Sequence, residues 1–195
     1  MYSKHPYEPF IPQEATKLII GTMPPYRFCI EPKELLDGDV DFYYGSKDNC
    51  FWELLEKATG AKLDSDKMEE TIKQRKALLE KLNIGITDIV DKCIHENGKS
   101  DDASLKNITH KPIKEILMQN PKIDTLIYTS AFVVKQMNQM ADKSYHSWEI
   151  PRKVGTVIMN GKKYNVIVLY SPSPLARRSI DAETQLTQYK NVFRA

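Results

Sequence analysis

Three segments of the chain gather residue types that could bind a planar, polar ligand. In the first, Phe42–Trp52, adjacent aromatic residues and Gly45 precede Asn49 at the start of a helical pattern. An aromatic ring such as Tyr44 could stack on a nucleobase, which contributes about 1–3 kcal/mol per base. The Asn49 amide could bond the edge of the same ligand. Hydrophobic packing is the simpler interpretation for Phe51 and Trp52, whereas both interpretations stay open for Tyr44 and Asn49.

The second segment follows the last predicted strand and reads Ser-Pro-Ser-Pro-Leu-Ala-Arg-Arg, residues 171–178. Serine hydroxyls and free backbone N–H groups on a proline-stiffened loop can bind phosphate oxygens. The two arginines add positive charge, and an exposed Leu175 could enter a base stack as a wedge. Taken alone, the segment is more simply a proline turn before a helix, with solvated arginines.

The third segment, Gly21-Thr-Met-Pro-Pro25, follows a short apolar run. Its glycine lets another group approach the backbone closely, and its prolines make the turn stiff. Its side chains offer little chemistry beyond the Thr22 hydroxyl. From this segment alone, a rigid turn is the simpler interpretation.

Alternating strand and helix patterns determine where these segments should lie. Apolar runs predict strands at 17–21, 85–90, 124–128, 154–159 and 164–170, and the last two flank Asn160-Gly161, which is typical of a tight hairpin. Helical patterns cover 49–59, 66–82, 113–119, 131–141 and 180–193. This order predicts an α/β fold whose parallel sheet is covered on both faces. Ligands in such folds bind beyond the carboxyl ends of the strands.

The bulk composition fits one globular domain of 195 residues, with residues 1–16 as a proline-bearing N-terminal arm. The formal net charge of +2 neither requires nor excludes nucleic-acid binding, since a local basic rim would suffice. Three widely spaced cysteines match no metal-binding pattern, and we expect them to be reduced. No apolar run approaches ~18 residues. We therefore expect a cytoplasmic protein without a membrane span.

The three segments together resemble the uracil-DNA glycosylase superfamily. The similarity rests on Gly21-x-x-Pro24, on Tyr44-Gly-x-x-x-Asn49-x-Phe-Trp52 and on the terminal Ser171-Pro-Ser-Pro-Leu175 loop, in that order. The nearest branches are the hypoxanthine-DNA (deoxyinosine) and the mismatch-specific glycosylases. Further similarity to the hypoxanthine-type branch lies in three central stretches, at residues 86–93, 100–105 and 127–130.

The resemblance implies a three-layer α/β/α sandwich around a central, mainly parallel four-stranded sheet. It implies a DNA glycosylase of base-excision repair that hydrolyses the N-glycosidic bond of a flipped-out deaminated base, hypoxanthine or uracil. Flipping is required because the bond is unreachable in a stacked duplex. The partner would be DNA containing such a base, with no metal and no cofactor, and the protein would be a monomer.

The resemblance also assigns roles to individual residues. Asn49 would be catalytic, and the base would be bound by Thr22, Met23 and Tyr44. DNA would be bound by Ser171, Ser173, Leu175, Arg177 and Arg178.

One departure from the resemblance concerns water activation. Met23 stands where many members have Asn or Asp, and a thioether cannot act as a base. The main alternative is therefore a member of the superfamily that binds nucleic acid or nucleobase without turnover. Asp88 and Asp102 could supply a carboxylate, although capping and surface ion pairs are their simpler interpretation. A serine hydrolase using Ser171 is a third alternative, but the chain lacks a Gly-x-Ser-x-Gly elbow.

Overall fold

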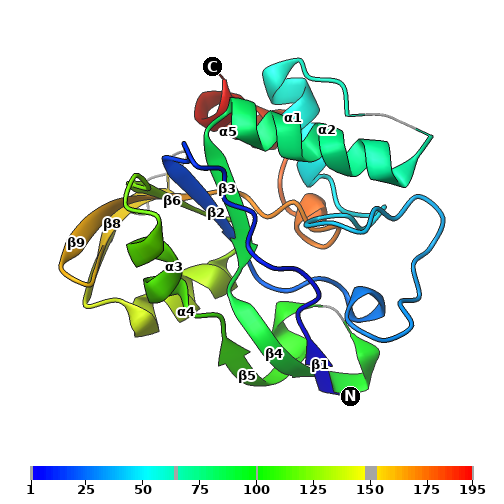
Figure 1. The fold of residues 1–195 in the computed structure, drawn as a ribbon, viewed down its shortest axis with the longest axis horizontal. Helices are drawn as coiled ribbons and strands as arrows, with labels where there is room; N and C mark the ends of the chain where they lie inside the picture. Colours follow the sequence, from blue (N-terminus) through cyan, green and yellow to red (C-terminus); the bar gives the residue numbers. More distant parts are fainter. Residues whose placement is uncertain (1, 64–65, 100, 148–152, 195) are drawn as a thin grey trace.

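The computed structural model describes residues 2–63, 66–99, 101–147 and 153–194. Its larger sheet has six strands and runs through the middle of the molecule (Figure 1). In their order across this sheet, the strands are β3 (Ile84–Asp88), β2 (Lys17–Gly21), β6 (Thr125–Tyr128), β9 (Lys162–Val168), β8 (Lys153–Met159) and β7 (Lys143–Ser147).

The first four of these strands are parallel to one another, as the α/β pattern predicts. β2 pairs with β3 on one side and β6 on the other, and β6 pairs with β9. The sheet is wider than the four strands expected, because β8 and β7 continue it in antiparallel pairing. The β8–β9 turn has the predicted hairpin chemistry, since Asn160 and Gly161 have φ of 51° and 73°.

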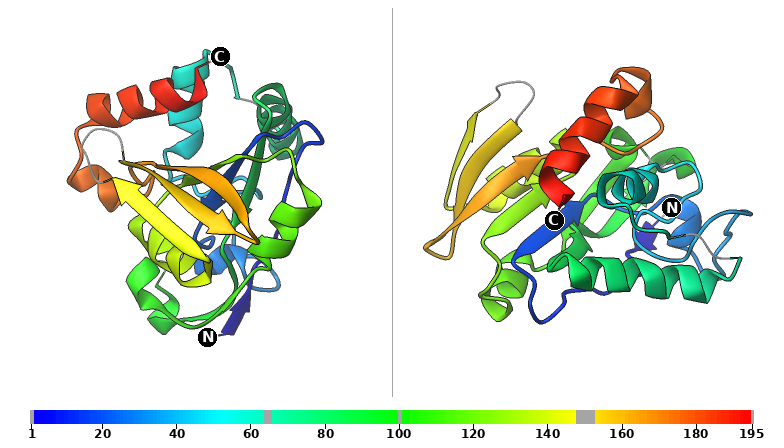
Figure 2. Two further views of the ribbon diagram at one scale, coloured as in Figure 1. Left: turned by 90° about the vertical axis from the view of Figure 1, so that its left-hand side faces the viewer. Right: turned by 90° about the horizontal axis from the view of Figure 1, so that it is seen from above.

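Helices cover both faces of this sheet, which gives three layers (Figure 2). The expected helices are all present, with ends that differ by at most two residues from the prediction. They are α1 (Phe51–Thr59), α2 (Met68–Lys81), α3 (Ile113–Gln119), α4 (Ala131–Met140) and α5 (Ala182–Phe193). Residues on β2 alternate between the faces: Leu18 and Ile20 pack with α3 and α4, whereas Ile19 packs with α1, α2 and α5.

A second, three-stranded sheet was not predicted. It has the order β1 (Tyr2–Lys4), β4 (Val90–His95) and β5 (Leu105–His110). The N-terminal arm supplies β1, and its Phe10 also forms an antiparallel bridge with Ile86 on β3. Residues 2–12 are therefore packed against two strands, and they are not a free extension.

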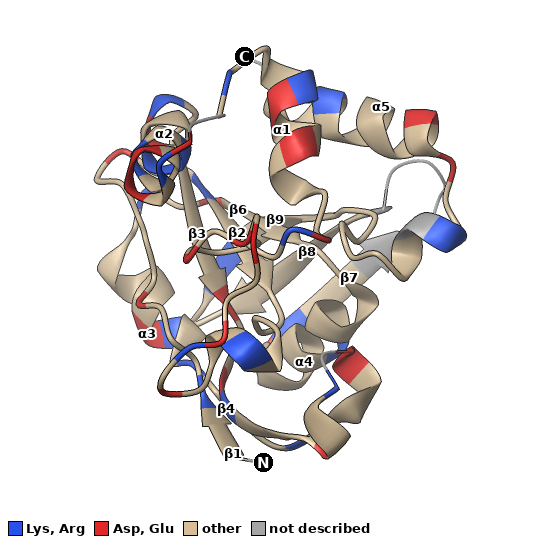
Figure 3. Cartoon of the chain, turned by 90° about the vertical axis from the view of Figure 1, so that its right-hand side faces the viewer, with Lys and Arg blue, Asp and Glu red and all other residues tan. Residues whose placement is uncertain are grey.

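The surface carries mixed charge on its helices: Figure 3 shows basic and acidic residues interspersed along α1 and α2. Within the described part of the chain, every helix is too short or too polar to cross a membrane.

Candidate active site

The carboxyl ends of the parallel strands bring polar groups from distant parts of the chain together. Gly21 ends β2 directly beside Asp88, which ends β3 in the same register. A Cβ atom added to Gly21 would lie 2.2 Å from Asp88 Oδ1 and 2.3 Å from the Tyr44 hydroxyl. The glycine is therefore needed for close packing, as the sequence indicated. We call this region the carboxyl edge and define it by Gly21, Thr22, Asp88, Thr129 and Ser130, together with Asp102, which hydrogen-bonds to Thr22 and Ser130.

Tyr44 reaches the carboxyl edge from the long loop that follows β2. Its hydroxyl hydrogen-bonds to Thr129 Oγ1 at 2.8 Å, and its ring stacks on Phe51 with centroids 4.3 Å apart. Burial, followed by the nearby Asp88 carboxylate, raises the pKa of Tyr44 well above its usual value. Its backbone has φ of 52°, which is uncommon for a residue with a side chain. The ring is thus neutral, fixed in orientation and covered on one face by Phe51.

Asn49 lies just before α1, and its side chain takes part in starting that helix. Its Oδ1 accepts a hydrogen bond from the backbone N–H of Phe51 at 2.9 Å, which is a capping interaction. This hydrogen bond uses the amide oxygen and leaves the two Nδ2 hydrogens to other acceptors. Phe51 and Trp52 are buried in the core, as expected.

The start of α1 is joined to the serine–proline loop through Cys50. Both its backbone N–H and its thiol donate to the carbonyl oxygen of Pro172, at 3.1 and 3.2 Å. Asn49 and the Ser171–Leu175 loop are therefore neighbours in space, although about 120 residues separate Cys50 from Pro172. The first segment therefore contacts the second through Cys50 and the third through Tyr44, which lies against Gly21.

The serine–proline loop is ordered by its own hydroxyl groups. Ser171 Oγ accepts from the Ser173 N–H at 3.3 Å, and Ser173 Oγ accepts from the Ala176 N–H at 3.4 Å. Leu175 is 64% exposed, and Arg178 is exposed as well. The side chain of Arg177 lies outside what the structure describes. The loop therefore presents an apolar tip to solvent, as a wedge would require.

Thr22 and Met23 follow Gly21 but lie in different surroundings. The Thr22 hydroxyl is 3.2 Å from the Ser130 hydroxyl, at the carboxyl edge. Met23 is half-buried against the apolar cluster that includes α3 and α4. Thr22 therefore joins the polar groups of the carboxyl edge, whereas Met23 contributes hydrophobic packing.

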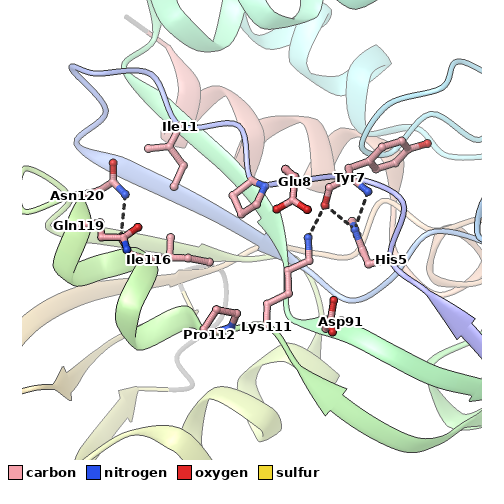
Figure 4. Close-up of a pocket in the computed structure, with 11 residues that line it drawn as sticks. His5, Tyr7, Glu8, Ile11, Asp91, Lys111, Pro112, Ile116, Gln119 and Asn120 are labelled. Carbon is pink, nitrogen blue, oxygen red and sulfur yellow. Dashed lines mark hydrogen bonds between the residues drawn. The ribbon is translucent and has the colours of Figure 1, made fainter.

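Two carboxyl groups belong to the carboxyl edge. Asp88 is buried, and its Oδ2 lies 2.9 Å from His5 Nε2 (Figure 4 draws His5 with its arm). The interpretation of Asp88 as a surface ion pair is therefore wrong. Burial raises the pKa of Asp102, which the nearby Asp88 raises further, while hydrogen bonds from Thr22 and Ser130 oppose the shift.

Sequence reasoning left His5 without a role and gave Asp88 and Asp102 only a secondary one. The available signal for Asp88 was its position at the end of a buried strand, beside the strand that ends in Gly21. No comparable signal existed for His5, because its partner is 83 residues away. Within the described residues, no group of three or more His, Cys, Asp or Glu side chains could hold a metal ion.

The fold and the site together define a class of protein. It is a three-layer α/β protein in which polar groups from the loops gather at the carboxyl ends of parallel strands. No protein-family model matches the chain, and no curated protein matches it by sequence. Among solved structures, it is similar to the solution NMR structure of a protein from Methanosarcina acetivorans described as a "putative Uracil DNA glycosylase". The TM-score is 0.63 at 19% identity, over 99% of this chain and 97% of that one. The chain therefore has a uracil DNA glycosylase-like fold.

Proposed function

We propose that the chain is a DNA glycosylase that hydrolyses the N-glycosidic bond of hypoxanthine or uracil flipped out of DNA. The observation that carries this proposal is the link between Cys50 and Pro172, which holds Asn49 beside the exposed Leu175 loop. An amide donor for the base and a wedge for the DNA stack are thus adjacent. This arrangement suits a base that leaves the duplex and enters a site next to the wedge.

The proposed roles follow from the chemistry of breaking the bond. A flipped base would stack on the face of Tyr44 opposite to Phe51. As the bond breaks, its electron pair moves onto the base, and donors such as Asn49 Nδ2 stabilise the negative charge that develops. Thr22 would bond the base edge, while Ser171, Ser173, Arg177 and Arg178 would contact phosphates. A carboxylate would hold the water, because Met23 cannot.

The proposal is tested by measuring base release from oligonucleotides that carry deoxyinosine or deoxyuridine, as single strands and as duplexes. Removing the Asn49 donors is expected to lower the single-turnover rate by about 100-fold. Asn49→Asp separates the two functions of this residue, because it keeps the oxygen that caps α1 and removes the N–H donors. Asn49→Ala removes both. Release from every substrate at the rate of a buffer blank would reject the proposal.

A second function is favoured by the position of Met23 in apolar packing. In this alternative, the protein binds nucleic acid or a free nucleobase without turnover. It predicts DNA binding that weakens steeply with salt, because phosphate contacts release counterions. Binding of this kind without base release would favour the alternative, and the absence of binding at low salt would reject it.

A further inference from the structure

The N-terminal arm delivers a histidine to the carboxyl edge. Strand β1 pairs with β4, the backbone N–H of His5 donates to Asp91 O at 2.7 Å, and Phe10 bridges to Ile86, so the arm is fixed before and after His5. His5 is buried between Asp88 and the backbone of Tyr7, and its ring lies 5.6 Å from that of Tyr43. The ring is therefore enclosed, with Nε2 facing Asp88 and Nδ1 facing the backbone of Tyr7.

Each ring nitrogen of His5 has a polar neighbour. Nδ1 lies 3.1 Å from the Tyr7 backbone N and 2.9 Å from the Tyr7 carbonyl oxygen, which also accepts from Lys111 Nζ at 2.6 Å (Figure 4). An ionised Asp88 can only accept, so its hydrogen bond to the ring requires a proton on Nε2, whether Nδ1 accepts from the Tyr7 N–H or donates to the Tyr7 carbonyl. Nε2 therefore donates to Asp88 Oδ2 at 2.9 Å.

The two oxygens of Asp88 have different surroundings. Oδ2 is held by His5, whereas Oδ1 lies over Gly21 and next to the Tyr44 hydroxyl. A carboxylate fixed through one oxygen can hold a water with the other without rotating. A histidine that orients an acid in this way is the reverse of the usual pair, in which an acid orients a histidine.

We propose that His5 is a positioning residue that holds Asp88 so that its Oδ1 can bind and deprotonate the attacking water. This inference rests on the proposed glycosylase function. The water oxygen forms a bond to C1′ while the C1′–N bond breaks and its electron pair leaves with the base. The water proton passes to Asp88 Oδ1 and from there to solvent, so no oxidant, metal or cofactor is needed.

The first test examines the pair without any need for activity. In ¹H–¹⁵N correlation spectra of the histidine rings, His5 should show a proton on Nε2 that exchanges slowly with water. The signal is assigned by its loss in His5→Gln, and the exchange should become fast in Asp88→Ala. A His5 ring with its proton only on Nδ1 would overturn the inference, whatever the activity of the chain.

The second test compares single-turnover rates and DNA affinities in full-length variants. His5→Leu should lower the rate by about tenfold or more while the Kd for DNA stays within about threefold. His5→Gln, whose amide can donate to Asp88, should recover most of the rate. Ser3→Ala is the matched control: it removes the 2.7 Å contact between Ser3 Oγ and His95 Nδ1, which also anchors the arm, but leaves His5 in place.

A purely structural role for His5 gives a different pattern. The rate would then follow the melting temperature across all three arm variants, and His5→Gln would be no better than His5→Leu. Either result overturns the inference. So does a loss of single-turnover rate from His5→Leu that persists when Asp88 is already replaced by alanine. If the unmodified chain releases no base, the glycosylase proposal fails, and the catalytic role of His5 fails with it. The ring spectrum then still shows whether His5 holds Asp88.

Discussion

Two aspartates in different regions of the molecule have opposite electrostatic environments. Asp39 lies in the loop of residues 27–47, and its carboxylate accepts four hydrogen bonds: two from Arg27 and one each from the backbone N–H groups of Leu36 and Lys47. Burial acts to raise its pKa, but these bonds outweigh burial and lower it. At the carboxyl edge, burial prevails and raises the pKa of Asp102.

The difference distinguishes a structural carboxylate from one available for chemistry. The loop that delivers Tyr44 is stabilised by the Asp39 carboxylate, whose four hydrogen bonds to the protein occupy both of its oxygens. Asp102 is held in a setting that disfavours its charge, and such settings concentrate at functional sites. Changes to the loop should therefore affect stability most, and changes to the carboxyl edge should affect activity most.

The largest effect is expected from Gly21→Ala, which disturbs the carboxyl edge without touching the loop. Its Cβ would meet Asp88 Oδ1 and the Tyr44 hydroxyl, and both groups are held by other partners. We expect the single-turnover rate of base release to fall by about 100-fold or more, since catalytic groups tolerate little displacement.

Gly85→Ala is the matched control on the adjacent strand. The atoms nearest to its Cβ would be those of the apolar side chains of Leu18 and Ile11, at 3.1–3.3 Å. It should cost some stability and little activity. Equal losses of activity in the two variants would mean that the carboxyl edge has no special role.

The next largest effect is expected from Asp39→Asn, which disturbs the loop. Removal of a buried charge partner leaves Arg27 uncompensated and should lower the free energy of unfolding by about 2–4 kcal/mol at neutral pH. Because the pKa of Asp39 is lowered in the folded state, its stabilisation is present at neutral pH. It is lost as the pH falls through that lowered value.

Urea unfolding at neutral and acidic pH measures this difference. The gap between Asp39→Asn and the unmodified chain should narrow on acidification, while the exposed Asp37→Asn should stay close to the unmodified chain throughout. A gap that widens in acid would contradict the assignment of Asp39 as a structural carboxylate.

A smaller effect is expected from Leu175→Ala, at the exposed tip of the serine–proline loop. A wedge is needed only where a base stack must be opened, so release from duplex DNA should fall by about tenfold and release from single strands should fall less. The melting temperature should not change, because the side chain is 64% exposed. Leu36→Ala, at a 50% exposed leucine in the Asp39 loop, provides the control and should leave both rates unchanged.

The sequence was sufficient to predict the elements that depend on local pattern. The side chains of residues 17–21 alternate between the two apolar faces of the sheet, and the helix at 113–119 ends before Pro121. Both elements can therefore be recognised from residues close to them in the sequence. Strand β1 has three residues and pairs with β4 about 90 residues further along the chain, and the six residues of β5 are mostly polar. The contact between His5 and Asp88 depends on that same pairing. Nothing local in the sequence could have indicated it.

The smallest effect is expected from Asp102→Asn, and its change in stability should be opposite in sign to that of Asp39→Asn. Asp102→Asn replaces a carboxyl whose pKa is raised by burial with a neutral amide that can still bond to Thr22 and Ser130. In the folded state Asp102 binds its proton more tightly than in the unfolded chain, so ionisation at neutral pH destabilises the fold. The variant should therefore melt higher at pH 7, by about 2 °C. This gain should vanish as the pH falls below the unfolded value of about 4. Thermal melts across this range measure the effect, and a lower melting temperature at pH 7 would show that the Asp102 carboxylate stabilises the fold, as that of Asp39 does.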